Sequence, residues 1–211
     1  MYKLISATPS PYARKVRIAL IEKGLPFQLV TEVPWDNATE TPRYNPLEKL
    51  PILIAGDGHS VYESRYILEW LEAKHAVPPM LPDDSDGRLA ARHVEVLADG
   101  VCDAFVLTFW ERARAPEHQS REWLARQRRK IDGGIRALAE IVGAREYAVG
   151  QRFGLADIAA ATVIGYLSVR DPSYDWRGPY PNLARYSDRM EQRPSFAGTR
   201  PVPQKITDKV V

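Results

Sequence analysis

The hydrophobic periodicity of the chain changes once, between residues 76 and 87, and that change limits what the chain can fold into. Before it, short apolar runs of strand length alternate with helical spacing, whereas after it every apolar pattern has helical spacing. The segment 78–86 between them is rich in proline and aspartate and closes with a helix start, which is typical of a linker. The sequence therefore predicts two domains of different class.

The first domain is predicted over residues 1–77. Its strand-like segments are 2–6, 27–33, 50–54 and 60–62. Helical spacing follows the first strand and stops at Gly24, and it resumes at Ser64 after the hairpin dipeptide Asp57-Gly58. The predicted order is β-α-β, loop, β-β-α, which is the order of a thioredoxin-like α/β domain.

The second domain is predicted to be all-helical, over residues 87–211. Long helices are expected at about 87–114, 118–143, 155–169 and 182–192. No alternating strand pattern or hairpin dipeptide interrupts them, so these helices are expected to form a bundle.

Charge and composition exclude several function classes. The 29 basic and 27 acidic residues give a net charge of only +2, which argues against nucleic acid or an anionic membrane as partner. No apolar run approaches the roughly 18 residues of a membrane span. The four histidines are not spaced as metal ligands, and the single cysteine, Cys102, cannot form an internal disulfide. We expect no metal site, a cytoplasmic location and a small-molecule partner.

Ser10 stands between the first strand and the first helix, with Pro11 at the first helical position. One interpretation is a plain N-cap, because serine before proline is a favoured helix start. The other uses the same geometry: the positive end of a helix favours an anion, so a bound thiol would ionise more readily beside the Ser10 hydroxyl.

Two further junctions have a structural and a functional interpretation. Leu50 and Pro51 precede the third strand, either as an ordinary strand start or with the Leu50 backbone turned outward to pair with an extended peptide. Glu63 and Ser64 form either a helix cap or a site for a ligand's ammonium and carboxylate groups. Lys49 is either solvated or bound to a second carboxylate.

These motifs together resemble the glutathione S-transferase family. The matching segments are Ser10-Pro11-Tyr12-Ala13-Arg14-Lys15-Val16-Arg17, Asn45-Pro46-Leu47-Glu48-Lys49-Leu50-Pro51-Ile52-Leu53, Glu63-Ser64 and Arg193-Pro194-Ser195-Phe196. They occur in the family's order and spacing, and with the helical second half they extend the resemblance over nearly the whole chain.

The resemblance implies glutathione as co-substrate and a role for each motif. Ser10 would activate the glutathione thiol, Leu50 would pair with the cysteinyl backbone, and Glu63 with Ser64 would hold the γ-glutamyl end. Lys49 would lie near the glycyl carboxylate. The helical domain would supply the site for an electrophilic apolar substrate, and a two-fold homodimer would form in which Asp99 reaches the ligand of the partner.

Two departures from the family pattern refine this expectation. Members that exchange disulfides carry cysteine where this chain has Ser10, and serine cannot form a mixed disulfide. The family's usual Ser or Thr helix cap is replaced by Gly154, although Asp157 is placed to return a hydrogen bond to it, so we assign Asp157 to folding. Cys102 lies among apolar residues and is interpreted as a small buried hydrophobe.

Other interpretations stay open from the sequence. The chain could keep this fold as a non-catalytic binding or regulatory protein, or act as a glutathione-dependent reductase or isomerase. Four aromatic residues either line an apolar substrate pocket or belong to the core: Phe105, Phe109, Trp110 and Tyr166. The basic run at residues 126–130 is interpreted as a solvated helix face, because Glu122 lies four residues before Arg126.

Overall fold

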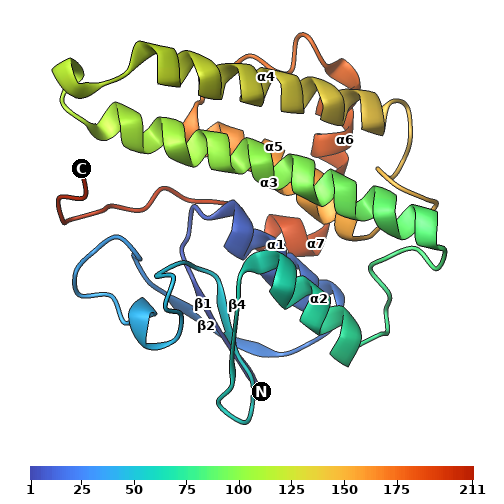
Figure 1. Ribbon diagram of the computed structural model, residues 1–211. Coiled ribbons are helices and arrows are strands. Elements are labelled where there is room, and N and C mark those ends of the chain that lie inside the picture. The colour runs from blue at the N-terminus through green and yellow to red at the C-terminus, as the bar shows by residue number, and fades with distance from the viewer. The chain divides into compact units, whose positions relative to one another are not determined.

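In the computed structural model, which describes residues 1–211, the strands form one sheet in the order β2-β1-β3-β4 (Figure 1). Their bounds are β1 Tyr2–Ser6, β2 Phe27–Thr31, β3 Ile52–Ile54 and β4 Ser60–Tyr62. β1 pairs in parallel with β2 and antiparallel with β3, which in turn pairs antiparallel with β4. The thioredoxin-like element order that the sequence predicts is confirmed.

Two helices, α1 Pro11–Glu22 and α2 Ser64–Lys74, pack beside each other, and α2 packs against β3 and β4. Leu4 and Ile5 are successive residues of β1 and both are buried, so both faces of the sheet are covered. The predicted stop of the first helix is confirmed, because the Lys23 N–H closes the last turn onto Ala19 and Gly24 follows with φ of +64°.

The chain divides into two units, and the division differs from the expected domains at the C-terminal end. One unit contains Met1–Met80 together with Arg193–Val210, and the other contains Leu81–Gln192. Residues 193–210, including the short helix α7 Pro194–Ala197, thus belong to the thioredoxin-like unit. Long-range polar contacts account for this: Arg193 pairs with Glu22 at 2.9 Å, and Arg14 Nη2 donates to the Phe196 carbonyl at 3.1 Å.

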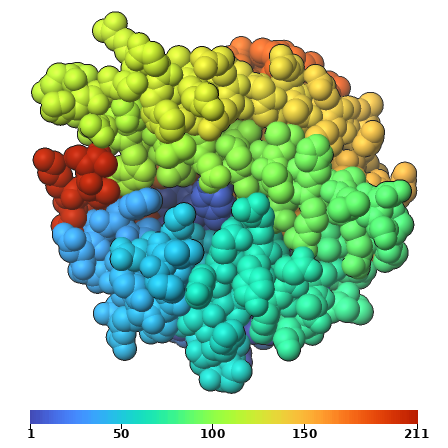
Figure 2. Space-filling view, in the orientation of Figure 1, coloured from blue at the N-terminus to red at the C-terminus, as the bar shows by residue number.

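The C-terminal tail continues along the same unit and meets the loop after β2. The carboxylate of Asp36 accepts hydrogen bonds from the backbone N–H and the hydroxyl of Thr207, at 2.9 and 2.8 Å. Gln204 Nε2 donates to the Glu32 carbonyl at 3.0 Å. In Figure 2 the red tail accordingly lies beside the blue segment around residues 30–40. The tail is therefore part of the scaffold of the first unit.

The second unit is a bundle of long helices, as predicted. Their bounds are α3 Ser85–Ala113, α4 Arg121–Val142, α5 Leu155–Arg170 and α6 Pro181–Glu191. α5 is buried along almost its whole length and packs against α3, so it is the core helix. At Gly134 of α4 an added Cβ would lie 2.2 Å from Val101 Cγ2, so the absence of a side chain allows α3 and α4 to approach closely. None of the helices is long and apolar enough to cross a membrane.

Asp157 lies in the interior of the helical unit, fully buried near the start of α5. Its Oδ2 accepts from the Gly154 N–H at 3.0 Å, which is the hydrogen bond expected from the sequence. Its Oδ1 accepts two more, from the Ala148 N–H at 2.8 Å and the Tyr186 hydroxyl at 2.7 Å. One carboxylate thus joins three parts of the fold, in agreement with a folding role.

Candidate functional site

The candidate residues of the thioredoxin-like unit meet at one end of the sheet. Three residues stand opposite one another on β1, β3 and β4: Ile5, Ile52 and Tyr62. Ala7 lies two residues after Ile5, and Leu50 lies two residues before Ile52. Because β1 and β3 are antiparallel, both residues lie at the same end of the sheet, and their side chains share one buried cluster. Glu63 follows Tyr62 directly, and the Ser10 N–H donates to the Ala7 carbonyl at 3.1 Å. The strand register therefore brings Ser10, Leu50 and Glu63 together at this end of the sheet.

Ser10 is the N-cap of α1, with its Oγ accepting a hydrogen bond from the Ala13 N–H at 3.2 Å. The capping interpretation is thus confirmed, and it leaves the hydroxyl proton of Ser10 without an acceptor in the chain. The first turn of α1 carries no acidic side chain, so nothing on the helix itself offsets its positive end. Capping and donation to an anion are therefore compatible at this residue.

At the junction before β3, the backbone of Leu50 is available for hydrogen bonds. The Leu50–Pro51 peptide bond is cis, and neither the N–H nor the carbonyl of Leu50 makes a hydrogen bond within the chain. Beside it, the Lys49 side chain is exposed while its carbonyl accepts from Asn45 Nδ2 at 2.8 Å. The Asn45 amide oxygen in turn accepts from the Leu47 N–H at 2.9 Å. Asn45, which is only 1% exposed, thus fixes the turn that presents Lys49 and Leu50.

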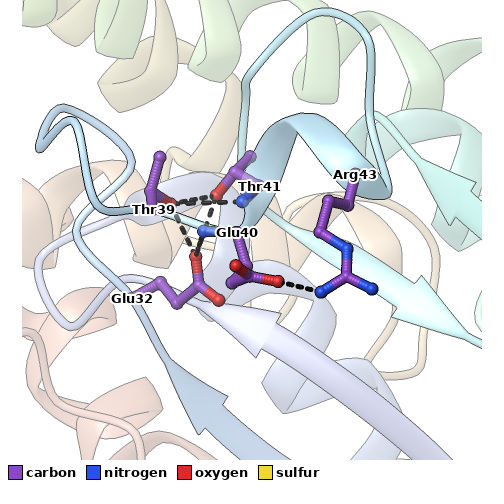
Figure 3. Close-up of polar contacts among 5 residues, drawn as sticks. All are labelled: Glu32, Thr39, Glu40, Thr41 and Arg43. Atoms are coloured by element: carbon purple, nitrogen blue, oxygen red, sulfur yellow. Dashed lines mark hydrogen bonds and ion pairs between the residues drawn. The ribbon is translucent and has the colours of Figure 1, made fainter.

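A second polar cluster holds the loop that leads to this turn (Figure 3). Glu32 Oε2 accepts from the Thr39 hydroxyl at 2.6 Å, the Glu40 N–H at 3.1 Å and the Thr41 hydroxyl at 3.2 Å. The Thr41 carbonyl then accepts from the Asn45 N–H at 3.0 Å. Sequence reasoning missed both Glu32 and Asn45 as positioning residues, because an anchoring side chain and a solvated one look alike in a polar loop.

We predict that Asn45→Ala lowers the free energy of unfolding by about 1–3 kcal/mol, because it removes both hydrogen bonds of a buried amide side chain. Glutathione affinity should fall as well, since the turn carrying Lys49 and Leu50 is no longer held. Chemical denaturation and calorimetry measure the two effects. Asn37→Ala is the matched control, because Asn37 is an exposed asparagine of the same connection and its side chain makes no hydrogen bond. Equal affinities in the two variants would remove Asn45 from the site.

Glu63 is the N-cap of α2 and has an unusual backbone for a residue with a side chain, at φ 70° and ψ 124°. Its carboxylate accepts from the backbone N–H groups of Arg65 at 3.1 Å and Tyr66 at 3.3 Å. The side chain remains 47% exposed. Ser64, at the first helical position, is buried and its hydroxyl lies 3.4 Å from Glu63 Oε1. This junction presents an accessible carboxylate next to a helix N-terminus.

The aromatic residues of the helical unit separate into two groups. Phe105 and Phe109 line a cavity of about 400 Å³ between α3, α4 and the end of α5. Trp110 instead packs edge-on against Phe109, with 5.1 Å between the ring centroids. Tyr166 packs in the same way against Phe105, with 6.2 Å between the ring centroids. Cys102 is buried, as its surroundings in the sequence indicate.

The geometry can be compared with known proteins at this point. Residues 9–74 match the family model of the glutathione S-transferase N-terminal domain, and residues 121–189 match that of the C-terminal domain. The uncharacterised GST-like protein YibF of Escherichia coli K12 is 35% identical over 94% of this chain and 98% of that protein. The chain belongs to the glutathione S-transferase family.

Two solved structures of glutathione S-transferases are similar to this chain. That from Methylobacterium radiotolerans, in complex with glutathione sulfonate, is 67% identical with a TM-score of 0.98, and the match covers 100% of this chain and 99% of the other. That from Methylobacillus flagellatus, with glutathione bound, is 39% identical with a TM-score of 0.92, over 96% and 100% of the two chains. These complexes support glutathione as the co-substrate.

Proposed function

We propose that this transferase ionises the thiol of glutathione and directs it at an electrophilic carbon of an apolar substrate. The observation that carries the proposal is Ser10, whose oxygen caps α1 while its proton stays available to an anion. A free thiol with a pKa of about 8.5 is only a few per cent thiolate at neutral pH. Lowering this pKa by about two units corresponds to about 2.7 kcal/mol, which a hydroxyl donor together with a helix N-terminus can supply.

The remaining residues hold the tripeptide. The N–H and carbonyl of Leu50 pair with the cysteinyl backbone as an added strand would, since both are without partners in the chain. Glu63 pairs with the γ-glutamyl ammonium, and Ser64 binds the adjacent carboxylate through its N–H and hydroxyl. Lys49 meets the glycyl carboxylate. The thiolate then forms a C–S bond, and the leaving group departs with its electron pair.

Calorimetry with millimolar glutathione tests the proposal. Wild-type protein should release heat, and Glu63→Gln should bind about 10-fold more weakly, because a charge-assisted contact becomes a neutral one. The glutamine oxygen still caps α2, so folding is preserved. Glu69→Gln, at an exposed position of the same helix, is the matched control. Absence of heat with the wild type would end the proposal, and equal affinity of Glu63→Gln and the control would remove Glu63 from the site.

The proposal includes a cytoplasmic homodimer in which Asp99 approaches the partner's ligand. In the single chain Asp99 is 6% exposed on α3. The rival function is glutathione binding without catalysis. It predicts retention on glutathione resin with no turnover of a reactive aryl halide, whereas a reductase or isomerase would act on a disulfide or on a cis-trans substrate.

A further inference from the structure

The cavity of the helical unit is lined by positively charged side chains as well as by apolar ones. Its apolar lining includes Phe105, Phe109, Leu124 and Ile131. Three arginines line it as well, one from each surrounding helix: Arg112 of α3, Arg128 of α4 and Arg170 of α5. Asp171 is the one acidic residue of the lining. The cavity therefore combines apolar walls with an excess of positive charge.

Arg170 is held in place by the aromatic residues around it. Its Nε donates to the Tyr166 hydroxyl at 2.8 Å, and its guanidinium lies 4.1 Å from the centre of the Phe109 ring. Burial raises the pKa of Tyr166 to about 12, so the phenol stays neutral and does not offset the charge of Arg170. The terminal nitrogens of Arg170 make no hydrogen bond within the chain.

The other two arginines of the lining also have side-chain nitrogens that are free to bind an anion. Arg128 uses its Nε for Asp132 at 2.8 Å and stacks on Tyr174 at 4.4 Å, which leaves its terminal nitrogens without a partner. The Arg112 side chain has no hydrogen bond or ion pair in the chain. Asp171 accepts from the Ser173 hydroxyl at 2.7 Å and pairs with none of the three arginines. A planar guanidinium offers two parallel N–H donors, which match the two oxygens of a carboxylate.

The size of the cavity restricts the occupant to a small molecule. A volume of about 400 Å³ lies within the range of small-ligand sites. The apolar walls suit an aromatic ring, and the arginines suit a negative group attached to it. A neutral ring would leave Arg112 and Arg170 without an anionic partner, whereas Arg128 already pairs with Asp132.

We propose that this cavity binds an aromatic ligand bearing a carboxylate, and that the electrophile of the proposed reaction belongs to this class. The first half stands on the helical unit alone, whereas the second half rests on the proposed function.

Binding is tested on the full chain without glutathione, by calorimetry with 4-chloro-3-nitrobenzoate and its neutral analogue 4-chloro-3-nitrobenzamide. The benzoate should bind about 10-fold more tightly than the benzamide, and added salt should reduce that difference. Arg112→Gln should weaken benzoate binding about 10-fold and leave benzamide binding unchanged. Arg112 is exposed and its side chain makes no hydrogen bond or ion pair, so the variant should keep the wild-type unfolding temperature.

Arg126→Gln is the matched control, because Arg126 is an exposed arginine of α4 that does not line the cavity. It should bind both probes as the wild type does. Equal affinity of the wild type for benzoate and benzamide would overturn the inference. So would an Arg112→Gln variant that binds the benzoate as tightly as the control.

Turnover separates this inference from the proposed function. With either probe the glutathione thiolate forms a C–S bond, the C–Cl bond breaks and chloride leaves. The ratio of kcat/KM to the uncatalysed rate should be higher for the benzoate. Benzoate binding without turnover of either probe would contradict the proposed function and leave the ligand class standing. Turnover of both probes without a preference for the benzoate would contradict the ligand class and leave the transferase function standing.

Discussion

Ser10→Ala lowers the turnover of glutathione with 1-chloro-2,4-dinitrobenzene by about 10- to 50-fold near neutral pH, and leaves glutathione affinity nearly unchanged. The upper limit follows from ionisation: a thiol whose pKa returns from about 6.5 to about 8.5 falls from half ionised to about 1% at pH 6.5. The lower limit allows for the positive end of α1, which remains in the variant. Affinity is expected to be retained because the proposed contacts at Leu50, Glu63 and Ser64 do not involve this hydroxyl.

The pH profile distinguishes loss of ionisation from loss of structure. The wild-type rate should rise with pH through the lowered thiol pKa and then level off. In Ser10→Ala the rise should continue toward the ordinary thiol pKa of about 8.5, so the two rates converge as the pH increases. A variant that had only lost structure would be slower by the same factor at every pH.

Two further substitutions separate capping from donation. Ser10→Thr keeps both the cap oxygen and the hydroxyl proton, and it should retain most of the activity. Ser10→Asp keeps the cap but replaces the donor with a negative charge, so the helix is preserved while the thiolate is repelled. Wild-type turnover in Ser10→Ala would mean that Ser10 is only a helix cap.

Asp157→Ala lowers the free energy of unfolding by about 3–5 kcal/mol, which is a large share of the stability of a typical domain. The carboxylate is fully buried and accepts from Ala148, Gly154 and Tyr186. Removing it leaves three donors without their partner, and two of them, the Ala148 N–H and the Tyr186 hydroxyl, are buried. Denaturant unfolding, with a probe that reports on the helical unit, measures the effect.

Tyr186→Phe is the matched comparison for Asp157→Ala. It removes one of the three donors and keeps the ring, so it should cost about 1–3 kcal/mol. If Asp157→Ala cost less than Tyr186→Phe, Asp157 would not be the centre of this network. Catalytic rates of folded Asp157→Ala protein should match the wild type, because the residue takes no part in the proposed chemistry.

The order of elements could be predicted because local signals mark it. Gly24 ends the first helix and Asp57-Gly58 closes the hairpin, and both signals depend only on backbone conformation at single residues. The placement of residues 193–210 could not be predicted. It depends on contacts such as Arg14 with Phe196, whose partners are 182 residues apart and carry no common pattern.

The residues of the candidate site also differ in whether a local sequence signal marks them. Ser10 and Glu63 stand out in the sequence because both occupy strand-to-helix junctions, and both are caps in the structure. Asn45 does not stand out, since its two side-chain hydrogen bonds exist only once the turn has formed. The sequence around Arg128 indicates a solvated helix face, and only the packing of α3, α4 and α5 places this residue on a cavity.

The grouping of Arg193–Val210 with the thioredoxin-like unit has a consequence for biosynthesis. A ribosome releases the segment up to Met80 long before Glu22 and Arg14 can meet Arg193 and Phe196. The thioredoxin-like unit is therefore complete only after residues 193–210 have been synthesised, and these follow the helical unit in the chain. A nascent chain arrested at the linker would lack the contacts that Arg193 and Phe196 make with its amino-terminal residues.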